Sequence, residues 1–162
     1  MEDYQKEYLN KDLVKLKEKF GDERGFIQPL CDLNMKSASL IFTKPGQWRA
    51  NHYHKKDWHF IYVIKGQILD VIVNLDIKSK NFGKVKRYKM KEGDILIVPN
   101  NYAHGYECLS KNCSVLYHLD NYRNSKSENG ILFNDKELNI KWHTKRPILS
   151  KRDKLANSFK FF

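Results

Sequence analysis

The chain has 162 residues, and its 41% hydrophobic and 13% aromatic content is enough for one packed domain and argues against intrinsic disorder. No apolar run approaches the roughly 18 residues of a membrane span, and the first residues lack the basic-then-apolar order of a signal peptide. The 30 Lys and Arg residues against 19 Asp and Glu give a net charge of +11, which favours an anionic partner such as a nucleic acid, a membrane surface or a phosphorylated small molecule.

The first twenty residues have the pattern of an amphipathic helix. Leu9, Leu13, Leu16 and Phe20 recur at steps of four, three and four, which places them on one helical face. Gly21 follows where a C-terminal helix cap is expected. The sequence therefore predicts an N-terminal helix that packs on the domain.

From residue 36 onward the sequence has the character of β structure. Short segments rich in Ile, Val, Phe and Tyr alternate with turn residues, and they span 39–43, 58–64, 67–75, 85–88, 95–98 and 115–119. No later helical segment is long enough for βαβ units, so an antiparallel sandwich or barrel is predicted. The polar tail over 124–162 is expected to wrap the outside of this barrel or to cap its mouth.

The three cysteines, Cys31, Cys108 and Cys113, include no C-x-x-C pair. We therefore expect neither a disulfide framework nor a cysteine-based zinc site. The expected compartment is the cytoplasm, and the expected organisation is a single domain over 1–162.

Four of the six histidines fall in a regular arrangement. The order along the chain is Gly46, His52, His54, His59 and Gly66, then Gly93, Pro99 and His104. Histidines two apart on a strand leave the same face, so His52 and His54 point together. The spacing resembles the two motifs of the cupin superfamily, with His59 where the first motif has Glu. This resemblance implies a cupin (jelly-roll) barrel with these side chains inside.

Such a cluster has two functional interpretations. His52, His54, His59 and His104 could ligate a divalent metal, since neutral imidazoles suit Zn, Fe, Ni or Cu. They could equally line a metal-free pocket as bases and hydrogen-bond donors. The remaining interpretation is that some of them are ordinary polar residues of the barrel lining.

The sequence around these histidines resembles one cupin family closely, the dTDP-4-dehydrorhamnose 3,5-epimerases and related nucleotide-sugar epimerases. The similar segments occur in the family's order and cover most of the chain: GDERGF at 21–26, RANHY at 49–53, GQILDV at 66–71, PNNYAHGY at 99–106, LY at 116–117, DNY at 120–122 and LSKRD at 149–153.

The resemblance implies inversion of a carbon beside the 4-keto group of a nucleotide-diphospho-6-deoxysugar, at C3 and/or C5. It assigns His52 as the base, Asp153 as the carboxylate that hydrogen-bonds the other nitrogen of His52, and Tyr117 as the acid on the opposite ring face. His59 stands where the family has a lysine that assists the enolate oxygen. A neutral imidazole still donates one hydrogen bond there, without the charge of an ammonium.

Further residues are implied to bind the substrate. Arg24 and Arg49 would hold the diphosphate by charge-assisted hydrogen bonds. The other implied contacts lie in the matching segments or beside the base, at Asn51, His54, His104 and Tyr122. The resemblance also implies catalysis without a metal or other cofactor, a homodimer, and a role in surface-polysaccharide synthesis.

Three alternatives remain open at the level of sequence. The segment HYHKK at 52–56 looks like that of the cupin sugar 3,4-ketoisomerases, which act on similar nucleotide sugars. A metal-dependent cupin enzyme would use the four histidines. A non-enzymatic cupin could bind a nucleotide sugar or nucleic acid. Nucleic acid is disfavoured because the lysines are spread along the chain and no recognition motif is present, and no membrane partner is expected.

Overall fold

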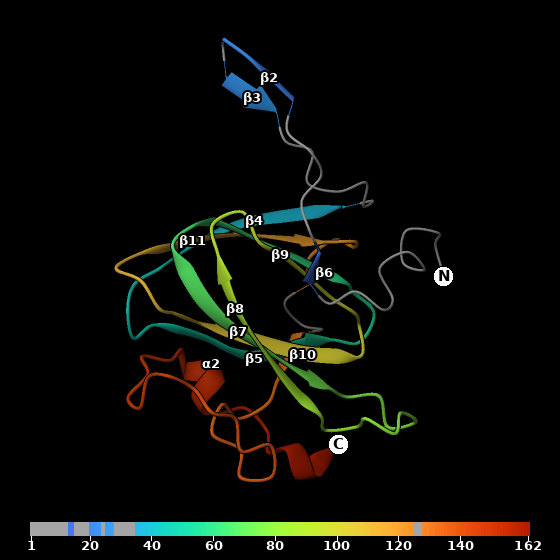
Figure 1. The fold of residues 1–162 in the computed structure, drawn as a ribbon. Coiled ribbons are helices and arrows are strands. Elements are labelled where there is room, and N and C mark those ends of the chain that lie inside the picture. Colours follow the sequence, from blue (N-terminus) through green and yellow to red (C-terminus); the bar gives the residue numbers. More distant parts are fainter. Residues whose placement is uncertain (1–12, 15–19, 24, 28–34, 125–127) are drawn as a thin grey trace.

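Two five-stranded antiparallel sheets form the body of the molecule, one above the other in Figure 1. The computed structural model describes residues 13–14, 20–23, 25–27, 35–124 and 128–162. The first sheet has the order β1 (Leu13–Val14), β9 (Ile95–Val98), β6 (His59–Lys65), β11 (Cys113–Leu119), β4 (Ser37–Thr43). The second has the order β12 (Glu128–Gly130), β5 (Trp48–His54), β10 (Tyr102–Cys108), β7 (Gln67–Asn74), β8 (Val85–Lys91). The predicted antiparallel barrel is confirmed.

The apolar core lies between the two sheets and fixes which residues face inward. In β11 the residues alternate regularly between buried and half-buried, as the period of two in a strand requires. Val115 on the buried face packs with Val63 of β6 and Ile72 of β7. Tyr117 shares that face, so the same alternation that builds the core also aims the Tyr117 ring into the interior.

The predicted N-terminal helix is wrong at the residues that the structure describes. Leu13–Val14 forms β1, which pairs with β9, and Phe20–Asp22 forms β2, which pairs with β3 (Gly25–Ile27). Gly21, expected to end the helix, sits inside β2 opposite Phe26. Pairing with the open backbone groups of a sheet edge overrides the helical spacing of the leucines. The rest of that prediction, including Leu9 and Leu16, lies outside the described residues.

The six predicted β segments all contain strands, at β4, β6, β7, β8, β9 and β11. Apolar patterning alone did not mark β5 and β10, because polar residues and glycine interrupt both segments, as in WRANHYH and YAHGYEC. The spacing of His52 and His54 nevertheless indicates a strand at β5. These two polar strands are neighbours in the second sheet, and they carry most of the cluster described below.

The structure contains a disulfide that the cysteine spacing did not predict. Cys108 ends β10 and Cys113 begins β11, and the tight connection brings their Cα atoms to 5.9 Å. The short connection over 109–112 passes from the second sheet to the first and supplies this proximity without a C-x-x-C pattern. This single disulfide differs from the framework of several disulfides that the sequence argued against. Cys31 lies outside the described residues.

The C-terminal tail wraps the outer side of the second sheet, as expected, and lies beneath β5 in Figure 1. Ile148 pairs with Gln47 just before β5, and Asn157 pairs with Ile131 just after β12. The tail contains helix α2 (Lys151–Lys154) and the 3-10 helix η1 (Phe159–Phe161). Because Ile148 is anchored at the start of β5, α2 lies against the same strand that carries His52.

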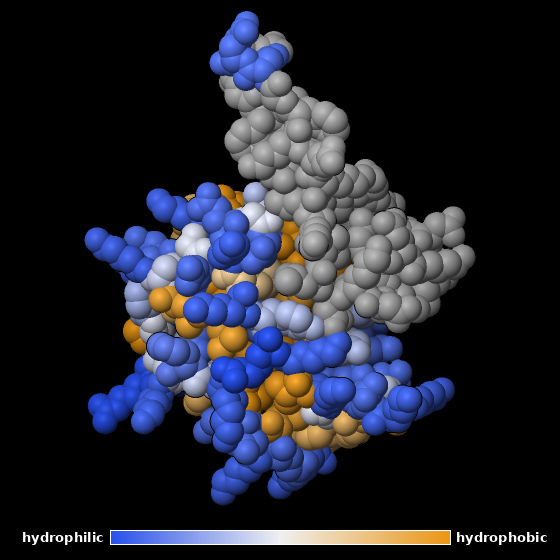
Figure 2. All heavy atoms as spheres, viewed as in Figure 1, coloured by the Kyte–Doolittle hydropathy of each residue, from blue (hydrophilic) through white to orange (hydrophobic). Residues whose placement is uncertain are grey.

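Hydrophilic side chains cover much of the face seen in Figure 2, with smaller apolar areas between them. Among the described residues, the helices are too short or too polar to cross a membrane.

Candidate active site

A cavity of about 640 Å³ opens between the two sheets and is large enough for a small-molecule ligand. Strands β4, β5, β6 and β11 and the helix α2 contribute its walls. It brings together six of the residues that were predicted from the sequence: Arg49, His52, His54, His59, Tyr117 and Asp153.

An irregularity in β5 allows Arg49 and His52 to line the same cavity. Residues three apart on a regular strand point to opposite faces. Here His52 pairs with His104, but Arg49 pairs with Tyr106, so β5 carries one extra residue between the two pairs. Such a β-bulge turns Arg49 to the face that His52 already occupies. A Cβ on Gly105 would approach the bulged backbone to 2.6 Å at the Arg49 carbonyl oxygen, so this close contact requires glycine.

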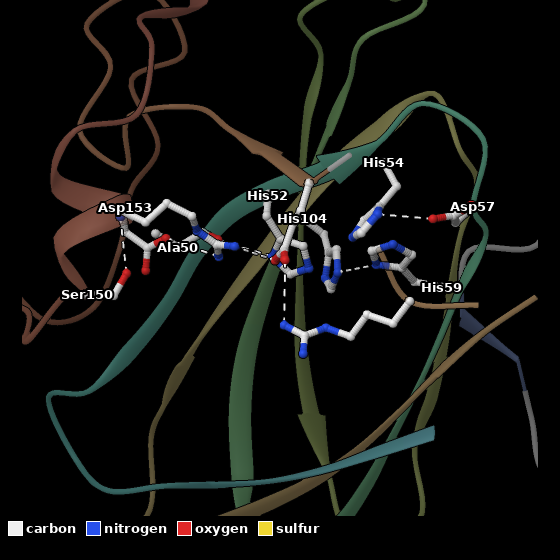
Figure 3. Close-up of polar contacts among 11 residues, drawn as sticks. Ala50, His52, His54, Asp57, His59, His104, Ser150 and Asp153 are labelled. Carbon is white, nitrogen blue, oxygen red and sulfur yellow. Dashed lines mark hydrogen bonds and ion pairs between the residues drawn. The ribbon is translucent and has the colours of Figure 1, made fainter. Parts of the chain in front are cut away.

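Four imidazoles gather at the inner end of the cavity (Figure 3). The ring centroid of His52 lies 4.4 Å from that of His104 and 5.4 Å from that of His59. His59 Nδ1 and His104 Nε2 are 2.7 Å apart and share one hydrogen bond. His104 is fully buried, and His59 is 3% exposed.

Two of these histidines have a buried carboxylate partner. His54 Nδ1 lies 3.0 Å from Asp57 Oδ2, a contact drawn in Figure 3. His104 Nδ1 lies 3.5 Å from Asp70 Oδ2. Burial raises the pKa of Asp70 well above its ordinary value, so a protonated Asp70 donates to His104 Nδ1 and His104 keeps its own proton on Nε2, facing His59 Nδ1. Each contact fixes the orientation of its imidazole ring.

Burial keeps the imidazoles neutral. It lowers the pKa of His52 well below its ordinary value, and the neighbouring His104 adds to this while Glu128 opposes it. Burial and then His104 likewise hold the pKa of His59 far down. The pKa of His104 falls to about 3, mainly through burial. Near neutral pH, His52 therefore has a free lone pair with which to accept a proton.

Tyr117 reaches the cavity from the opposite sheet. Its ring stacks toward His52 with the centroids 6.2 Å apart and the planes inclined by 28°. Burial, followed by the nearby Asp70, raises the pKa of Tyr117 well above its ordinary value. The hydroxyl is buried and has no hydrogen-bond partner in the described part of the chain. It remains protonated and free to donate its proton to a ligand.

Asp153 lies at the cavity wall, where α2 begins. Its backbone N–H donates to Ser150 Oγ at 3.1 Å, which caps the helix, and only 7% of the residue is exposed. Its carboxylate meets Arg152 at 3.5 Å, whereas His52 Nδ1 faces the Ala50 carbonyl oxygen at 3.4 Å. Among the described residues, the expected hydrogen bond between Asp153 and His52 is thus not formed.

Three charged residues of the cavity were not identified from the sequence. Glu128 Oε1 accepts from Arg152 at 2.7 Å, and its Oε2 lies 3.7 Å from Arg123. Although burial raises the pKa of Glu128, the charges of His52 and Arg152 outweigh this and lower it. Two signals were available in the sequence: Arg152 belongs to the segment LSKRD at 149–153 beside Asp153, and Arg123 directly follows the segment DNY at 120–122.

The remaining predicted residues lie elsewhere. Arg24 lies outside the described residues. Asn51 is buried on β5 but is not part of the cavity wall. Tyr122 is 77% exposed and lines a neighbouring cavity of about 540 Å³ together with Lys55 and Lys56.

Two sets of side chains in the described residues have ligand atoms within 4.8 Å of one another, as a metal site requires. One set is His52, His59 and His104, and the other is His52, His54 and Glu128. Neutral imidazole nitrogens are suitable ligands for first-row transition metals, so the residues present fit such an ion.

Comparison with known proteins identifies the family. The model of the dTDP-4-dehydrorhamnose 3,5-epimerase family matches residues 10–160. The chain belongs to this family. The dTDP-4-dehydrorhamnose 3,5-epimerase of Shigella flexneri is 28% identical over 150 residues, which are 83% of this chain and 83% of that protein. The Bacillus subtilis spore coat polysaccharide biosynthesis protein SpsL is 30% identical over 146 residues, or 82% of this chain and 97% of that protein.

The fold agrees with solved structures of this epimerase family. The Bacillus anthracis dTDP-4-dehydrorhamnose 3,5-epimerase, solved with TDP and PPi bound, superimposes with a TM-score of 0.83 at 29% identity, covering 91% of this chain and 93% of that one. This agreement confirms the predicted mainly β, cupin-type jelly-roll fold of the epimerase family.

Proposed function

We propose that the chain epimerises C3 and/or C5 of a nucleotide-diphospho-4-keto-6-deoxysugar by proton transfer through an enolate. The observation that carries this proposal is the pairing of neutral His52 on β5 with protonated Tyr117 on β11 in one cavity. Support comes from the family and from relatives solved in complex with dTDP-4-keto-L-rhamnose and with dTDP-quinovose.

The reaction begins at the carbon beside the 4-keto group. Its proton is acidic because the electron pair left behind delocalises onto the keto oxygen as an enolate. His52 accepts this proton, and the nearby Glu128 favours the imidazolium that results. The base is uncharged in the resting enzyme and gains its charge as the enolate gains the opposite one.

The enolate is then protonated from the other face. Tyr117 comes from the sheet opposite to His52, so its hydroxyl can deliver a proton to the carbon from the opposite side. Inversion follows because removal and return of the proton use different faces of the sugar. His59 Nδ1 accepts the Nε2–H of His104, so neutral His59 keeps its own proton on Nε2 and supplies an uncharged donor near the enolate oxygen in place of the family's lysine.

Arginines of the cavity would hold the diphosphate. Arg49 lies on the bulge, and Arg123 and Arg152 both contact Glu128. Guanidinium groups match phosphate oxygens in charge and in bidentate geometry. The TDP and PPi bound to the Bacillus anthracis relative support a diphosphate subsite in this family.

The proposal extends to the setting of the enzyme. The residues named supply base, acid and donors, so the chemistry proposed needs no metal or other cofactor. We place the chain among cytoplasmic, homodimeric single-domain enzymes of surface-polysaccharide synthesis, a role that the name of SpsL suggests for that relative. The substrate partner is a nucleotide-diphosphate sugar, with no nucleic acid or membrane partner.

The test is turnover of defined substrates in deuterated water with a chelator present. A dTDP-linked and a GDP-linked 4-keto-6-deoxysugar are each incubated with the protein, and deuterium at C3 and C5 is followed by NMR. Incorporation with inversion at one or both carbons is expected for at least one nucleotide. Absence of exchange at both carbons in both substrates would overturn the proposal.

The diphosphate role of Arg49 can be tested separately by steady-state kinetics. Arg49→Lys should raise KM more than it lowers kcat, since lysine cannot bind phosphate oxygens in a bidentate way.

A further inference from the structure

Three imidazoles that approach from different strands share one small volume. His52 comes from β5, His59 from β6 and His104 from β10, and their potential ligand atoms all lie within 4.8 Å of one another. Their exposed fractions are 7%, 3% and 0%. Strands hold side chains more firmly than loops do, so these nitrogens converge before any ligand arrives.

The cluster also has the surroundings typical of metal-binding histidines. A histidine that ligates a metal commonly directs its second nitrogen to a carboxylate, which fixes the ring and increases its basicity. His104 has this partner in Asp70, at 3.5 Å from Nδ1, and so presents Nε2 to His59. One oxygen of Asp70, Oδ1, is buried and has no hydrogen-bond partner among the described residues.

The second candidate set is less suitable because its carboxylate is already engaged. Glu128 is held by Arg152 at 2.7 Å and lies 3.7 Å from Arg123. A metal at that set would have to draw Glu128 away from two guanidinium groups. The three-imidazole set requires no such loss.

We propose that His52, His59 and His104 bind a divalent zinc-class ion, which competes with the proton for the nitrogens of the catalytic pocket. The ion takes the place of the proton between His104 Nε2 and His59 Nδ1; His104 then carries its proton on Nδ1, and Asp70 releases its own proton to solvent and becomes the carboxylate partner. Tetrahedral zinc places its nitrogen ligands about 3.3 Å apart, so these two nitrogens separate by about half an ångström from their 2.7 Å contact.

Metal binding at this site goes beyond the proposed epimerase activity, and only the expected inhibition rests on that activity. An ion bound to the lone pair of His52 removes the base, so the metal-loaded protein should be inhibited and a chelator should restore its activity. The binding itself does not depend on any activity. It can therefore be measured on the protein alone.

The experiment titrates Co²⁺, and then Zn²⁺ as a competitor, into the full chain after chelator treatment. We expect visible absorption bands of a four- or five-coordinate cobalt site, a stoichiometry of one ion per chain, and displacement of cobalt by zinc. His59→Gln should raise the Kd by more than about 100-fold and Asp70→Asn by about 10- to 100-fold. Circular dichroism establishes that each variant is folded.

Two further variants discriminate between sites. Glu128→Gln should raise the Kd by less than about 10-fold, because it removes a charge near His52 but no ligand of the proposed site. His143→Gln removes an exposed imidazole outside the cavity and serves as the matched control. If His59→Gln fails to fold, Asp70→Asn and Glu128→Gln still decide between the two sets.

Several results would overturn the inference. Absence of cobalt bands in the wild-type protein would do so, as would binding that survives both His59→Gln and Asp70→Asn, or binding that depends on Glu128. A failure of the metal site leaves solvent exchange of the chelator-treated enzyme intact. A failure of the proposed function abolishes that exchange while metal binding persists, so the two failures are distinguishable.

Discussion

At the scale of single residues, burial matches the protonation states of His52 and Tyr117 to opposite tasks. Burial disfavours the charged form of both groups, so it lowers the pKa of the imidazole and raises that of the phenol. The same desolvation thus produces a free base on one sheet and a proton donor on the other. No ionised side chain is needed at either reacting position before the substrate binds.

Tyr117→Phe separates proton removal from proton return. His52 remains, so the substrate carbon should still exchange its proton with solvent deuterium, while formation of the inverted product falls by about 10²- to 10⁴-fold. The hydroxyl is buried without a partner in the described structure, so its loss should leave thermal stability nearly unchanged. Parallel NMR assays of exchange and of product stereochemistry measure this. Inversion at the wild-type rate would rule out Tyr117 as the acid.

The role of His59 can be tested in the same assay. His59→Ala removes the donor beside the enolate oxygen and should slow exchange by about 10²- to 10³-fold. The matched control is His118→Ala, which removes a half-buried imidazole that packs against Phe60 outside the cavity. Equal effects of the two variants would show that the loss at His59 reflects packing and not catalysis.

At the scale of elements, the bulge in β5 decides the composition of the site. It lets a phosphate-binding candidate, Arg49, and the base, His52, share one face although they stand three residues apart. Gly105 on β10 makes the bulge possible, because its missing Cβ leaves room for the displaced backbone. The segments RANHY and AHG therefore act as one structural unit across two strands.

Gly105→Ala should therefore disturb the site as well as the fold. The new methyl group would meet backbone atoms of Arg49, Ala50 and Asn51 at 2.6–2.7 Å, so we expect a loss of about 1–3 kcal/mol in the free energy of unfolding and a rise in KM with a fall in kcat. Gly130→Ala is the control for an added methyl group on a strand. Its nearest neighbour would be the Ala156 side chain at 3.2 Å, so we expect a smaller loss of stability than for Gly105→Ala. Denaturant unfolding and steady-state kinetics test both. A Gly105→Ala enzyme with unaltered kinetics would contradict the positioning role.

The elements also show what sequence patterns can and cannot predict. Strands with alternating apolar residues, such as β11, follow directly from the sequence because burial on one face dictates their period. The pairing of Leu13 with Leu96 does not, because it depends on an open edge contributed by a distant strand. Within the site, the spacing of His52 and His54 predicts a shared face. The approach of Glu128 to His52 depends on how β12 docks on β5, which local spacing does not encode.

At the scale of the whole molecule, Asp135 fastens the end of the chain to the segment that follows β12. Its carboxylate accepts from Ser158 Oγ and from the backbone N–H of Phe159, both at 2.8 Å, and from the N–H groups of Glu137 and Leu138. Burial raises the pKa of Asp135, but these hydrogen bonds outweigh it and hold the pKa below its ordinary value. The last residues of the chain are thus held against the segment that follows β12.

Asp135→Asn should destabilise the protein in a pH-dependent way. An amide oxygen replaces only part of the acceptor capacity, so the cost near neutral pH should be about 1–3 kcal/mol. Because the folded-state pKa is depressed, the stabilisation is present above the unfolded pKa of about 3.9 and is lost as the pH falls through the folded value. Denaturant unfolding from pH 7 to pH 3 should show the two proteins converging in acid. A constant difference would contradict this, and Asp76→Asn in an exposed turn is the control.

The net charge of +11 also acquires a more specific meaning at this scale. Among the described residues, the arginines at the cavity are Arg49, Arg123 and Arg152, whereas many lysines lie on exposed positions such as those of β8. Lysines on an edge strand protect it from pairing with other chains. Composition alone pointed toward nucleic acid as readily as toward a phosphorylated ligand, and the placement of the arginines favours the ligand.

The central claim is that His52 removes a proton from the carbon beside the keto group. Its most direct test compares wild-type protein with His52→Asn in deuterated water, with a chelator present and a nucleotide-linked 4-keto-6-deoxysugar as substrate. We predict deuterium at C3 and/or C5 with the wild-type enzyme and a loss of at least about 10²- to 10⁴-fold in the variant. Exchange at the wild-type rate in folded His52→Asn protein would contradict the claim.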